Sequence, residues 1–439
     1  MIVVENKILQ LVNKHKHGEA IGLTSICSAN LHVIKAAILN AKKYSQILLI
    51  ESTSNQVDQF GGYTGITPQQ FRKIVFDLAT ALNFPIENII LGGDHLGPNR
   101  WQNEISNSAM QKAKDQIAAY VSAGYTKIHL DASMKCADDG DEQIPLDPFV
   151  IAERSAILCK AAEDVFTKYG NDGEPPVYVI GTDVPPPGGA KEHHNKINVT
   201  SAEEVEETID LTKKAFEKYN LSDAWNRVVA VVVQPGVEFG DSIVFDYERT
   251  KSKKLVDVIE TKSNLVYEAH STDYQKKELL KQMVEDHFAI LKVGPWLTFA
   301  FREAVFALSL IEKELLSNKK GITLSNLFEV IEERMIVNPK YWEKYYDYSE
   351  EENKISRKFS YSDRIRYYWI DNFVNESLQR LISNLTNNKI PHTLLSQYLP
   401  VEYFAVKENI ITENPEEIIL NKIDSVLGIY NYATYGGTQ

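Results

Sequence analysis

The sequence is poor in cysteine, and its three cysteines, Cys27, Cys136 and Cys159, form neither a CxxC pair nor a disulfide framework. It also lacks a basic excess, because 47 lysines and arginines stand against 60 aspartates and glutamates, a net charge of −13. That charge argues against nucleic acid or an anionic membrane as a partner. Its apolar runs are too short to span a bilayer, and residues 1–16 lack the apolar stretch of a secretion signal. We therefore expect a cytoplasmic protein.

Glycine-rich nucleotide loops are absent as well. The glycine pairs at 61–62, 92–93 and 188–189 do not have the GxGxxG spacing, and no such motif follows an apolar run. This disfavours an open sheet that binds a dinucleotide. A hydrophobic content of 44% with 24% charged residues is typical of a globular chain with a sizeable core.

The main pattern present is an alternation of short runs rich in isoleucine, valine and leucine with longer segments of helical periodicity. Eight such runs occur, at Ala20–Ala29, Gln46–Thr53, Ile89–Leu96, Thr126–Ser133, Val177–Val184, Arg227–Pro235, Leu265–Thr272 and His287–Pro295. Strands that are apolar on both faces and alternate with helices indicate a parallel sheet covered by helices. Eight units in about 300 residues predict an α/β protein with a (β/α)8 TIM barrel.

The strand pattern ends near residue 317. We therefore divide the chain into a barrel, residues 1–316, and a C-terminal helical region, residues 317–439. The helical region is expected to pack on the barrel or to form an oligomer interface, and its predicted helices cover 330–337, 361–385 and 415–432.

Polar residues at the strand ends are the functional signal. A buried strand has no structural need for ionisable groups, yet seven of the eight runs end in an ionisable residue or an amide. In a parallel barrel all these ends open onto one rim, where active sites lie. The residues are Glu51, Asn55, Asp94, His95, His129, Asp131, Asp183, Gln234, Glu268, His270, Lys292 and Gly294.

Histidines and carboxylates that converge on one rim predict a divalent metal, because imidazole suits Zn²⁺ or Co²⁺ and carboxylates also admit Mg²⁺ or Mn²⁺. We assign His95 and His270 as ligands, with Asp183 and Asp131 competing for the third place. Asp131 could instead orient a histidine. His129 is as consistent with a satisfied core histidine as with a ligand.

The remaining strand-end residues are assigned to catalysis or to substrate binding. Asp94, beside a ligand, is the candidate acid–base group, with Glu268 and Asp131 as further catalytic candidates. Lys292 is expected to bind an anionic substrate group, although a Schiff-base role is an alternative. The other candidate substrate contacts are Glu51, Asn55, Gln59, Gln234 and Gly294, of which Gln59 lies in a polar loop suited to a lid, a sugar-hydroxyl contact or a plain connection.

Several long strings resemble the GatZ/KbaZ family, the larger subunit of tagatose-1,6-bisphosphate aldolase. They are ESTSNQVDQFGGYTG (Glu51–Gly65), GGDHLGPN (Gly92–Asn99), KIHLDAS (Lys127–Ser133), VVQPGVEF (Val232–Phe239), VYEAHSTDYQ (Val266–Gln275), ILKVGP (Ile290–Pro295) and SDRIRYYW (Ser362–Trp369). The resemblance implies a (β/α)8 barrel related to class II aldolases with a C-terminal helical part. It also implies that Asp94 and His95 correspond to the acid–base aspartate and the zinc-binding histidine of those enzymes, and His270 to another ligand.

Two positions depart from the family pattern. Asp183 stands where the family usually has glutamate, and Gln234 stands where a third histidine would be expected. Both departures leave the third metal ligand open.

The resemblance leaves three functions open. The chain could be a component of tagatose-1,6-bisphosphate aldolase that acts on ketohexose phosphates with a divalent metal, Zn²⁺ first, alongside a smaller GatY/KbaY-like class II subunit. It could be a self-sufficient 4-epimerase that interconverts fructose 6-phosphate and tagatose 6-phosphate. It could also be a non-catalytic scaffold for a partner aldolase, although the retained rim residues speak against an inert barrel.

Overall fold

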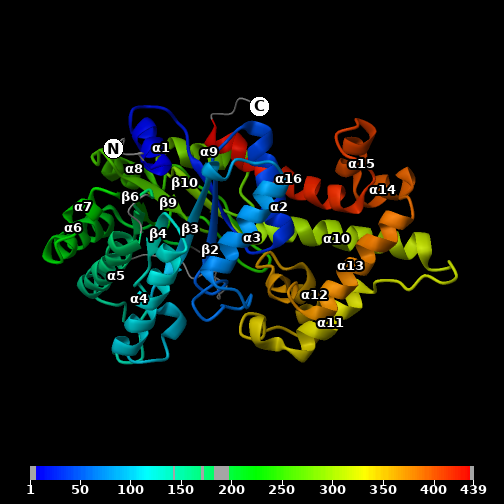
Figure 1. Ribbon diagram of the computed structural model, residues 1–439, viewed down its shortest axis with the longest axis horizontal. Helices are drawn as coiled ribbons and strands as arrows, with labels where there is room; N and C mark the ends of the chain where they lie inside the picture. The colour runs from blue at the N-terminus through cyan, green and yellow to red at the C-terminus, as the bar shows by residue number, and fades with distance from the viewer. Residues whose placement is uncertain (1–5, 142–143, 170–172, 182–196, 436–439) are drawn as a thin grey trace.

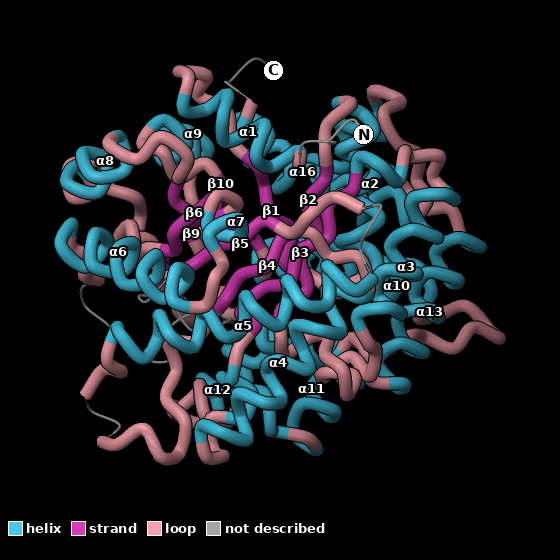
Figure 2. Tube along the Cα trace, turned by 60° about the vertical axis from the view of Figure 1, so that its left-hand side comes forward, coloured by secondary structure: helices cyan, strands magenta, loops and turns pink. Residues whose placement is uncertain are grey.

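The computed structural model describes residues 6–141, 144–169, 173–181 and 197–435. Within these residues eight parallel strands close into a barrel in the order β1-β10-β9-β6-β5-β4-β3-β2, with helices around it (Figures 1 and 2). The barrel strands are β1 (Leu23–Cys27), β2 (Leu48–Thr53), β3 (Ile89–Leu96), β4 (Lys127–Leu130), β5 (Val177–Ile180), β6 (Val228–Val232), β9 (Val266–Ala269) and β10 (Ile290–Val293). Each strand lies inside one of the eight apolar runs, so the predicted barrel is confirmed.

The helices around the barrel begin where their local sequences provide caps. Helix α3 (Pro68–Ala81) starts with a capping box between Thr67 and Gln70, and α6 (Ala202–Lys218) with one between Ser201 and Glu204. The other helices of this part are α1 (Lys7–Lys16), α2 (Leu31–Tyr44), α4 (Ser106–Ser122), α5 (Pro148–Tyr169), α7 (Ser222–Trp225), α8 (Lys253–Glu260) and α9 (Lys277–Glu285), with the 3-10 turns η1 (Ile86–Asn88) and η2 (Pro98–Trp101).

The C-terminal helices lie beside the barrel and then return to it. Helix α10 (Pro295–Leu316) runs away from the barrel to the right in Figure 1, where other helices pack around it. Those helices are α11 (Leu327–Val337), α12 (Glu350–Phe359), α13 (Asn372–Asn387), α14 (His392–Tyr398) and α15 (Pro400–Lys407), with the turn η3 (Pro339–Tyr341). Helix α16 (Pro415–Thr434) comes back, and its Tyr430 hydroxyl donates to the carbonyl of Thr272 at 2.9 Å. Among the described helices, none combines the length and apolarity that crossing a membrane would require.

The helix predicted over 361–385 is wrong in its first part. Asp363 has a φ of 46°, in the left-handed region, and the 3-10 turn η4 (Arg364–Tyr368) follows it. Asp371 then caps a new helix, α13, by accepting hydrogen bonds from the amides of Phe373 and Val374. Helical periodicity does not reveal a left-handed residue, and this break places η4 at the mouth of the barrel.

Charged side chains occupy the interior of the barrel. In register, Glu51 of β2 lies beside Gly92 of β3, and Gly92 beside Lys127 of β4. A Cβ at position 92 would lie 2.6 Å from the Glu51 side chain, so glycine leaves the space through which Glu51 Oε1 reaches Lys127 Nζ at 2.5 Å. Glu268 Oε2 of β9 contacts the same ammonium at 2.6 Å. All three charged side chains are fully buried, so each depends on the others for charge compensation.

A short antiparallel pair follows the sixth barrel strand and buries another carboxyl. Strands β7 (Glu238–Phe239) and β8 (Val244–Phe245) were not predicted from the sequence. Glu238 Oε1 accepts a hydrogen bond from the Phe239 amide at 3.0 Å, and the side chain is buried. Burial raises the pKa of Glu238 from its ordinary value of 4.5 to about 7.

Replacing Lys127 with methionine should destabilise the fold strongly. The variant leaves Glu51 and Glu268 buried with the Lys292 ammonium alone, and loss of one partner in such a buried charged group costs about 3–5 kcal/mol. The measurement is the free energy of unfolding in guanidinium chloride. The control Lys160→Met removes an exposed lysine of α5 and should change stability by no more than about 0.5 kcal/mol. If Lys127→Met and Lys160→Met lower the free energy of unfolding equally, Lys127 does not compensate the buried carboxylates.

Glu238 should make stability fall as pH rises from about 4.5 to about 7. The folded chain holds the proton that the unfolded chain has already released in this interval, so the folded state loses relative stability. Glu238→Gln should therefore gain about 1–3 kcal/mol over the native chain at pH 8 and nothing at pH 4. Exposed Glu314→Gln serves as the control. A gain that is the same at both pH values would refute the assignment.

Candidate functional site

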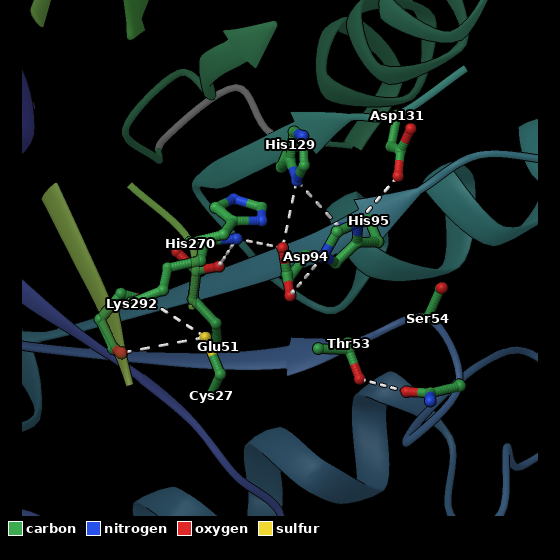
Figure 3. Close-up of polar contacts among 12 residues, drawn as sticks. Cys27, Glu51, Thr53, Ser54, Asp94, His95, His129, Asp131, His270 and Lys292 are labelled. Carbon is green, nitrogen blue, oxygen red and sulfur yellow. Dashed lines mark hydrogen bonds and ion pairs between the residues drawn. The ribbon is translucent and has the colours of Figure 1, made fainter. Parts of the chain in front are cut away.

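A cavity opens at the carboxyl ends of the barrel strands, as the barrel architecture predicts. Asp94 and His95 of β3, His270 after β9 and Lys292 of β10 line it, and Figure 3 shows these side chains gathered around one space. The carboxyl ends of strands distant in sequence thus supply one site.

An irregularity in β3 brings two consecutive side chains to this cavity. In a regular strand neighbouring residues point to opposite faces. The pairing of β3 with β4 shifts register between Gly93 and Leu96, and His95 has a φ of 51°, in the left-handed region. Such a bulge re-aims a side chain. Asp94 and His95 therefore both line the cavity.

Three histidines form the centre of the site. The ring centroids of His95 and His270 lie 4.9 Å apart, those of His95 and His129 5.1 Å, and those of His129 and His270 5.2 Å. His129 is fully buried and its Nε2 has no hydrogen-bond partner among the described residues. A buried imidazole nitrogen without a partner is costly unless a ligand satisfies it.

The residues whose possible metal-ligand atoms lie closest together are not the same set as the three neighbouring histidine rings. One ligand atom from each of Asp94, His129, Glu268 and His270 lies within 4.8 Å of the other three, whereas His95 falls outside this tightest set. His95 Nε2 is still only 3.7 Å from Asp94 Oδ2. His95 therefore lies beside the tightest set of ligand atoms rather than within it.

Each histidine has a carboxylate beside it. Asp131 Oδ2 bonds His95 Nδ1 at 2.8 Å, Asp94 Oδ1 bonds His129 Nδ1 at 3.1 Å, and Glu268 Oε1 bonds His270 Nε2 at 3.1 Å. Such pairs fix the ring orientation and direct the second nitrogen of each ring toward a ligand. In His129 this requires Nδ1 to donate its proton to Asp94, although the His95 amide also lies 3.2 Å from that nitrogen.

Lys292 connects the site to the charged interior. Its Nζ contacts Asp94 Oδ1, Glu268 Oε1 at 3.0 Å and Glu51 Oε2 at 3.1 Å. Three carboxylates therefore use all three N–H donors of this buried ammonium.

The same contacts set the protonation states. Burial alone would raise the pKa of Asp94, but His95 and Lys292 hold it well below its usual range, so the carboxyl is ionised. Burial alone would lower the pKa of Lys292, but Asp94, Glu268 and Glu51 raise it well above normal. Burial, reinforced by Lys292, lowers the pKa of His270 to about 3, and burial also lowers that of His129. Neutral imidazole is the form that binds metals, and His129 and His270 favour that form. Asp94 and Asp131 raise the pKa of His95 against the effect of burial, so this ring must release its proton before it binds a cation.

The charge of this group is compatible with a divalent metal. Four carboxylates, those of Glu51, Asp94, Asp131 and Glu268, surround two ammonium groups, an excess of two negative charges in a buried region. A divalent cation among the imidazoles would balance that excess.

The predicted site residues are brought together only in part. Asn55, Asp94, His95, His270, Lys292 and Gly294 line the cavity. Glu51, Asp131 and Glu268 do not line it and contact the residues that do. Gln59 Nε2 donates to the carbonyl of Lys112 at 2.9 Å, and Gln234 Oε1 accepts from the Gly236 amide at 2.8 Å, so neither faces the cavity. Asp183 lies outside the described residues.

Other residues of the site were missed or given too little weight. His129 completes the histidine group, and Lys127 compensates its carboxylates. A lysine and a histidine inside the apolar run at 127–130 were the signal for both residues. Arg366 and Tyr367 line the cavity from η4, and only the string SDRIRYYW indicated that segment.

Comparisons with known proteins agree with the resemblance read from the sequence. The model of the D-tagatose-1,6-bisphosphate aldolase subunit GatZ/KbaZ-like family matches residues 8–435. The crystal structure of a probable tagatose 6 phosphate kinase from Sinorhizobium meliloti 1021 is 43% identical with a TM-score of 0.85, over 94% of this chain and 100% of that one.

Two aldolase structures are much more distant. The YdjI aldolase from Escherichia coli K12 is 11% identical, with a TM-score of 0.43 over 88% of this chain and 100% of that one. Fructose-bisphosphate aldolase from Campylobacter jejuni is 12% identical, with a TM-score of 0.42 over 92% and 94%. Likenesses at this level do not bear on function, whereas the family match covers almost the whole chain. The chain therefore belongs to the D-tagatose-1,6-bisphosphate aldolase subunit GatZ/KbaZ-like family.

Proposed function

We propose that this chain is the component of tagatose-1,6-bisphosphate aldolase that carries a metal-dependent site for ketohexose phosphates. The observation that carries the proposal is the group of three histidine rings, within 5.2 Å of one another, beside the ionised Asp94 at the barrel mouth. The names of the family and of the Sinorhizobium meliloti relative both refer to a phosphorylated tagatose, which supports this substrate class.

His95, His129 and His270 are the residues that would hold the cation. The unpartnered Nε2 of His129 and the neutral state of His270 suit Zn²⁺, which favours imidazole ligands. His129 thus takes the third place for which Asp183 and Asp131 competed. Asp131, bonded to His95 Nδ1, is the positioning residue for that histidine.

When bound, the divalent cation would polarise the ketose carbonyl. Asp94 is the group that accepts the proton of the C4 hydroxyl, and Lys292 and His95 keep its carboxylate ionised in a buried setting. Loss of that proton allows the C3–C4 bond to break into two three-carbon pieces. Release of the pieces is aldol cleavage. Re-addition to the other face of the aldehyde is 4-epimerisation.

The 4-epimerase is the second candidate, and one observation favours it. Asp94, His95 and His270 line one cavity and the His129 ring lies beside theirs, so this chain brings together the acid–base group and the candidate metal ligands that epimerisation needs. Under this second proposal, epimerisation does not require a smaller class II subunit, and only cleavage of the bisphosphate could depend on one. A non-catalytic scaffold would have no use for these buried charges, which are costly to maintain.

Asn55 and Gly294 are the proposed substrate contacts among the residues assigned from sequence, because both line the cavity. Lys292 lines it too, but its three carboxylate partners suit it to holding Asp94 ionised rather than to binding a substrate anion.

The purified chain loaded with Zn²⁺ should convert tagatose 1,6-bisphosphate to triose phosphates, alone or with a smaller class II subunit. It should also be tested for conversion of fructose 6-phosphate to tagatose 6-phosphate, which would identify the epimerase. Asp94→Asn should lower kcat by about 10²–10⁴ with little change in KM, because it removes the proton acceptor and preserves shape. Inactivity in both assays, even with the smaller subunit, would establish the scaffold instead. ADP formation from ATP and tagatose 6-phosphate would also contradict the proposal.

His95→Ala, His129→Ala and His270→Ala should each weaken Zn²⁺ binding by more than about 100-fold, since removing even an outer partner of a ligand costs about 10–100-fold. Equilibrium dialysis with elemental analysis measures the bound metal. His392→Ala, in an exposed histidine of α14, is the matched control and should retain it. Stoichiometric metal in both His95→Ala and His270→Ala would show that the ligand assignment is wrong. If His129→Ala alone keeps stoichiometric metal, His129 is a core residue and not a ligand.

A further inference from the structure

Part of the cavity wall comes from the C-terminal region. Arg366 and Tyr367 of η4 line the same cavity as Asp94, His95 and Lys292. A substrate that reaches the histidines therefore also faces η4. Whether η4 can bind a ligand depends on which of its hydrogen-bond donors already have acceptors within the protein.

Arg366 is the cation of the described cavity wall that forms no close ion pair, and Asp363 and Asp273 act on it only at longer range. Among the described residues, the lysines and arginines that line the cavity are Lys292 and Arg366, and Lys292 already contacts three carboxylates. Arg366 forms no ion pair with any described residue. Its guanidinium donates from Nη1 to the carbonyls of Ser362 and Asp363 and from Nη2 to the Tyr367 hydroxyl at 3.0 Å. All three acceptors are uncharged groups.

Donors of Arg366 remain for a ligand. A guanidinium has five N–H donors, and the three hydrogen bonds above leave Nε–H and one Nη2 hydrogen without an acceptor among the described residues. Adjacent donors of this kind match two oxygens of a phosphate or carboxylate. The half-buried guanidinium is therefore suited to a bidentate anion.

Two helix N-termini at the cavity wall are closed by side chains of this chain. The N-terminus of α10 is closed by Asp273, whose Oδ1 accepts from the Gly294 amide at 3.1 Å and the Trp296 amide at 2.8 Å. The N-terminus of α2 is closed by Asn30, whose Oδ1 accepts from the amides of His32 and Val33. Neither helix N-terminus therefore competes with the guanidinium for an anion.

The turn that carries Arg366 is held firmly against the barrel. Asp363, fully buried, accepts a hydrogen bond from Thr298 Oγ1 at 2.6 Å and lies 3.2 Å from Arg302 Nη1, both in α10. The Tyr274 hydroxyl, next to the end of β9, donates to the carbonyl of Tyr361 at 2.6 Å. Because Asp363 is occupied by α10, it does not pair with Arg366, and the guanidinium keeps its position without a carboxylate partner.

We propose that Arg366 binds the phosphate monoester of the ketohexose phosphate, so that the C-terminal region selects phosphorylated substrates for a barrel that carries the chemistry. This subsite rests on the proposed function, because it assumes that a sugar lies between η4 and the histidines. Nε–H and the remaining Nη2 hydrogen contact two phosphate oxygens, and the Tyr367 hydroxyl orients the guanidinium.

The test compares the full-length Zn²⁺-loaded chain with Arg366→Gln by titration calorimetry, using fructose 6-phosphate, unphosphorylated fructose and inorganic phosphate. Arg366→Gln should raise the Kd for fructose 6-phosphate and for phosphate by about tenfold or more, as expected for the loss of a charged hydrogen-bond pair, and leave the Kd for fructose unchanged. Arg366→Lys should recover part of the phosphate affinity, because lysine restores the positive charge but not the two adjacent N–H donors of the guanidinium. Arg380→Gln, in an exposed arginine of α13, makes the same charge change away from the cavity and should bind like the native chain.

The outcomes separate the subsite from the proposed function. Equal fructose 6-phosphate affinity in the native chain and Arg366→Gln overturns the subsite alone, whereas no binding of any ketohexose phosphate by the native chain overturns both. Should Arg366→Gln fail to fold, phenylglyoxal labelling of the native chain followed by mass spectrometry decides the question. Phosphate should protect Arg366 from modification and leave Arg380 reactive, and unprotected labelling of Arg366 would reject the subsite.

Discussion

The structure depends on the neutralisation of charge inside a closed barrel. Lys127 and Lys292 lie between the carboxylates of Glu51, Asp94 and Glu268, all buried among apolar strands. Removing any one partner leaves the others uncompensated in a medium that solvates charge poorly. The barrel therefore keeps these charged residues together, and they in turn hold Asp94 ionised beside the neutral rings of His129 and His270. A remaining negative excess makes the same place favourable for a divalent cation.

Backbone irregularities turn this charged interior into a site open to ligands. Gly92 gives the Glu51 side chain room to reach Lys127 across β3, and the left-handed conformation of His95 brings its ring beside Asp94 at the cavity. Both devices lie in one short string, GGDH, at the end of β3. Local strain at this point is offset by the surrounding barrel, as is common at functional sites.

The C-terminal helices are part of the site as well as a lateral extension of the barrel. Asp363, held by Arg302 and Thr298 of α10, fixes η4 over the barrel mouth, and Tyr430 of α16 anchors that helix to the carbonyl of Thr272 beside the site. The barrel and the helical region thus share one cavity, although residues 364–368 follow the last barrel strand by about seventy positions.

Local sequence patterns were enough to predict the eight strands, the rim on which polar residues gather, the family and the pair Asp94-His95, because periodicity and strand-end position are local properties. The other features of the site depend on contacts between distant segments. Whether His129 is a ligand or a core histidine depends on which ring atoms it meets across the barrel, and whether Lys292 faces substrate or carboxylates depends on β2, β3 and β9 together. The position of Arg366 follows from a single left-handed residue, Asp363, that helical periodicity cannot register. Side-chain partners distant in sequence are fixed by closure of the barrel and by the return of the C-terminal chain, and no local pattern encodes either of them.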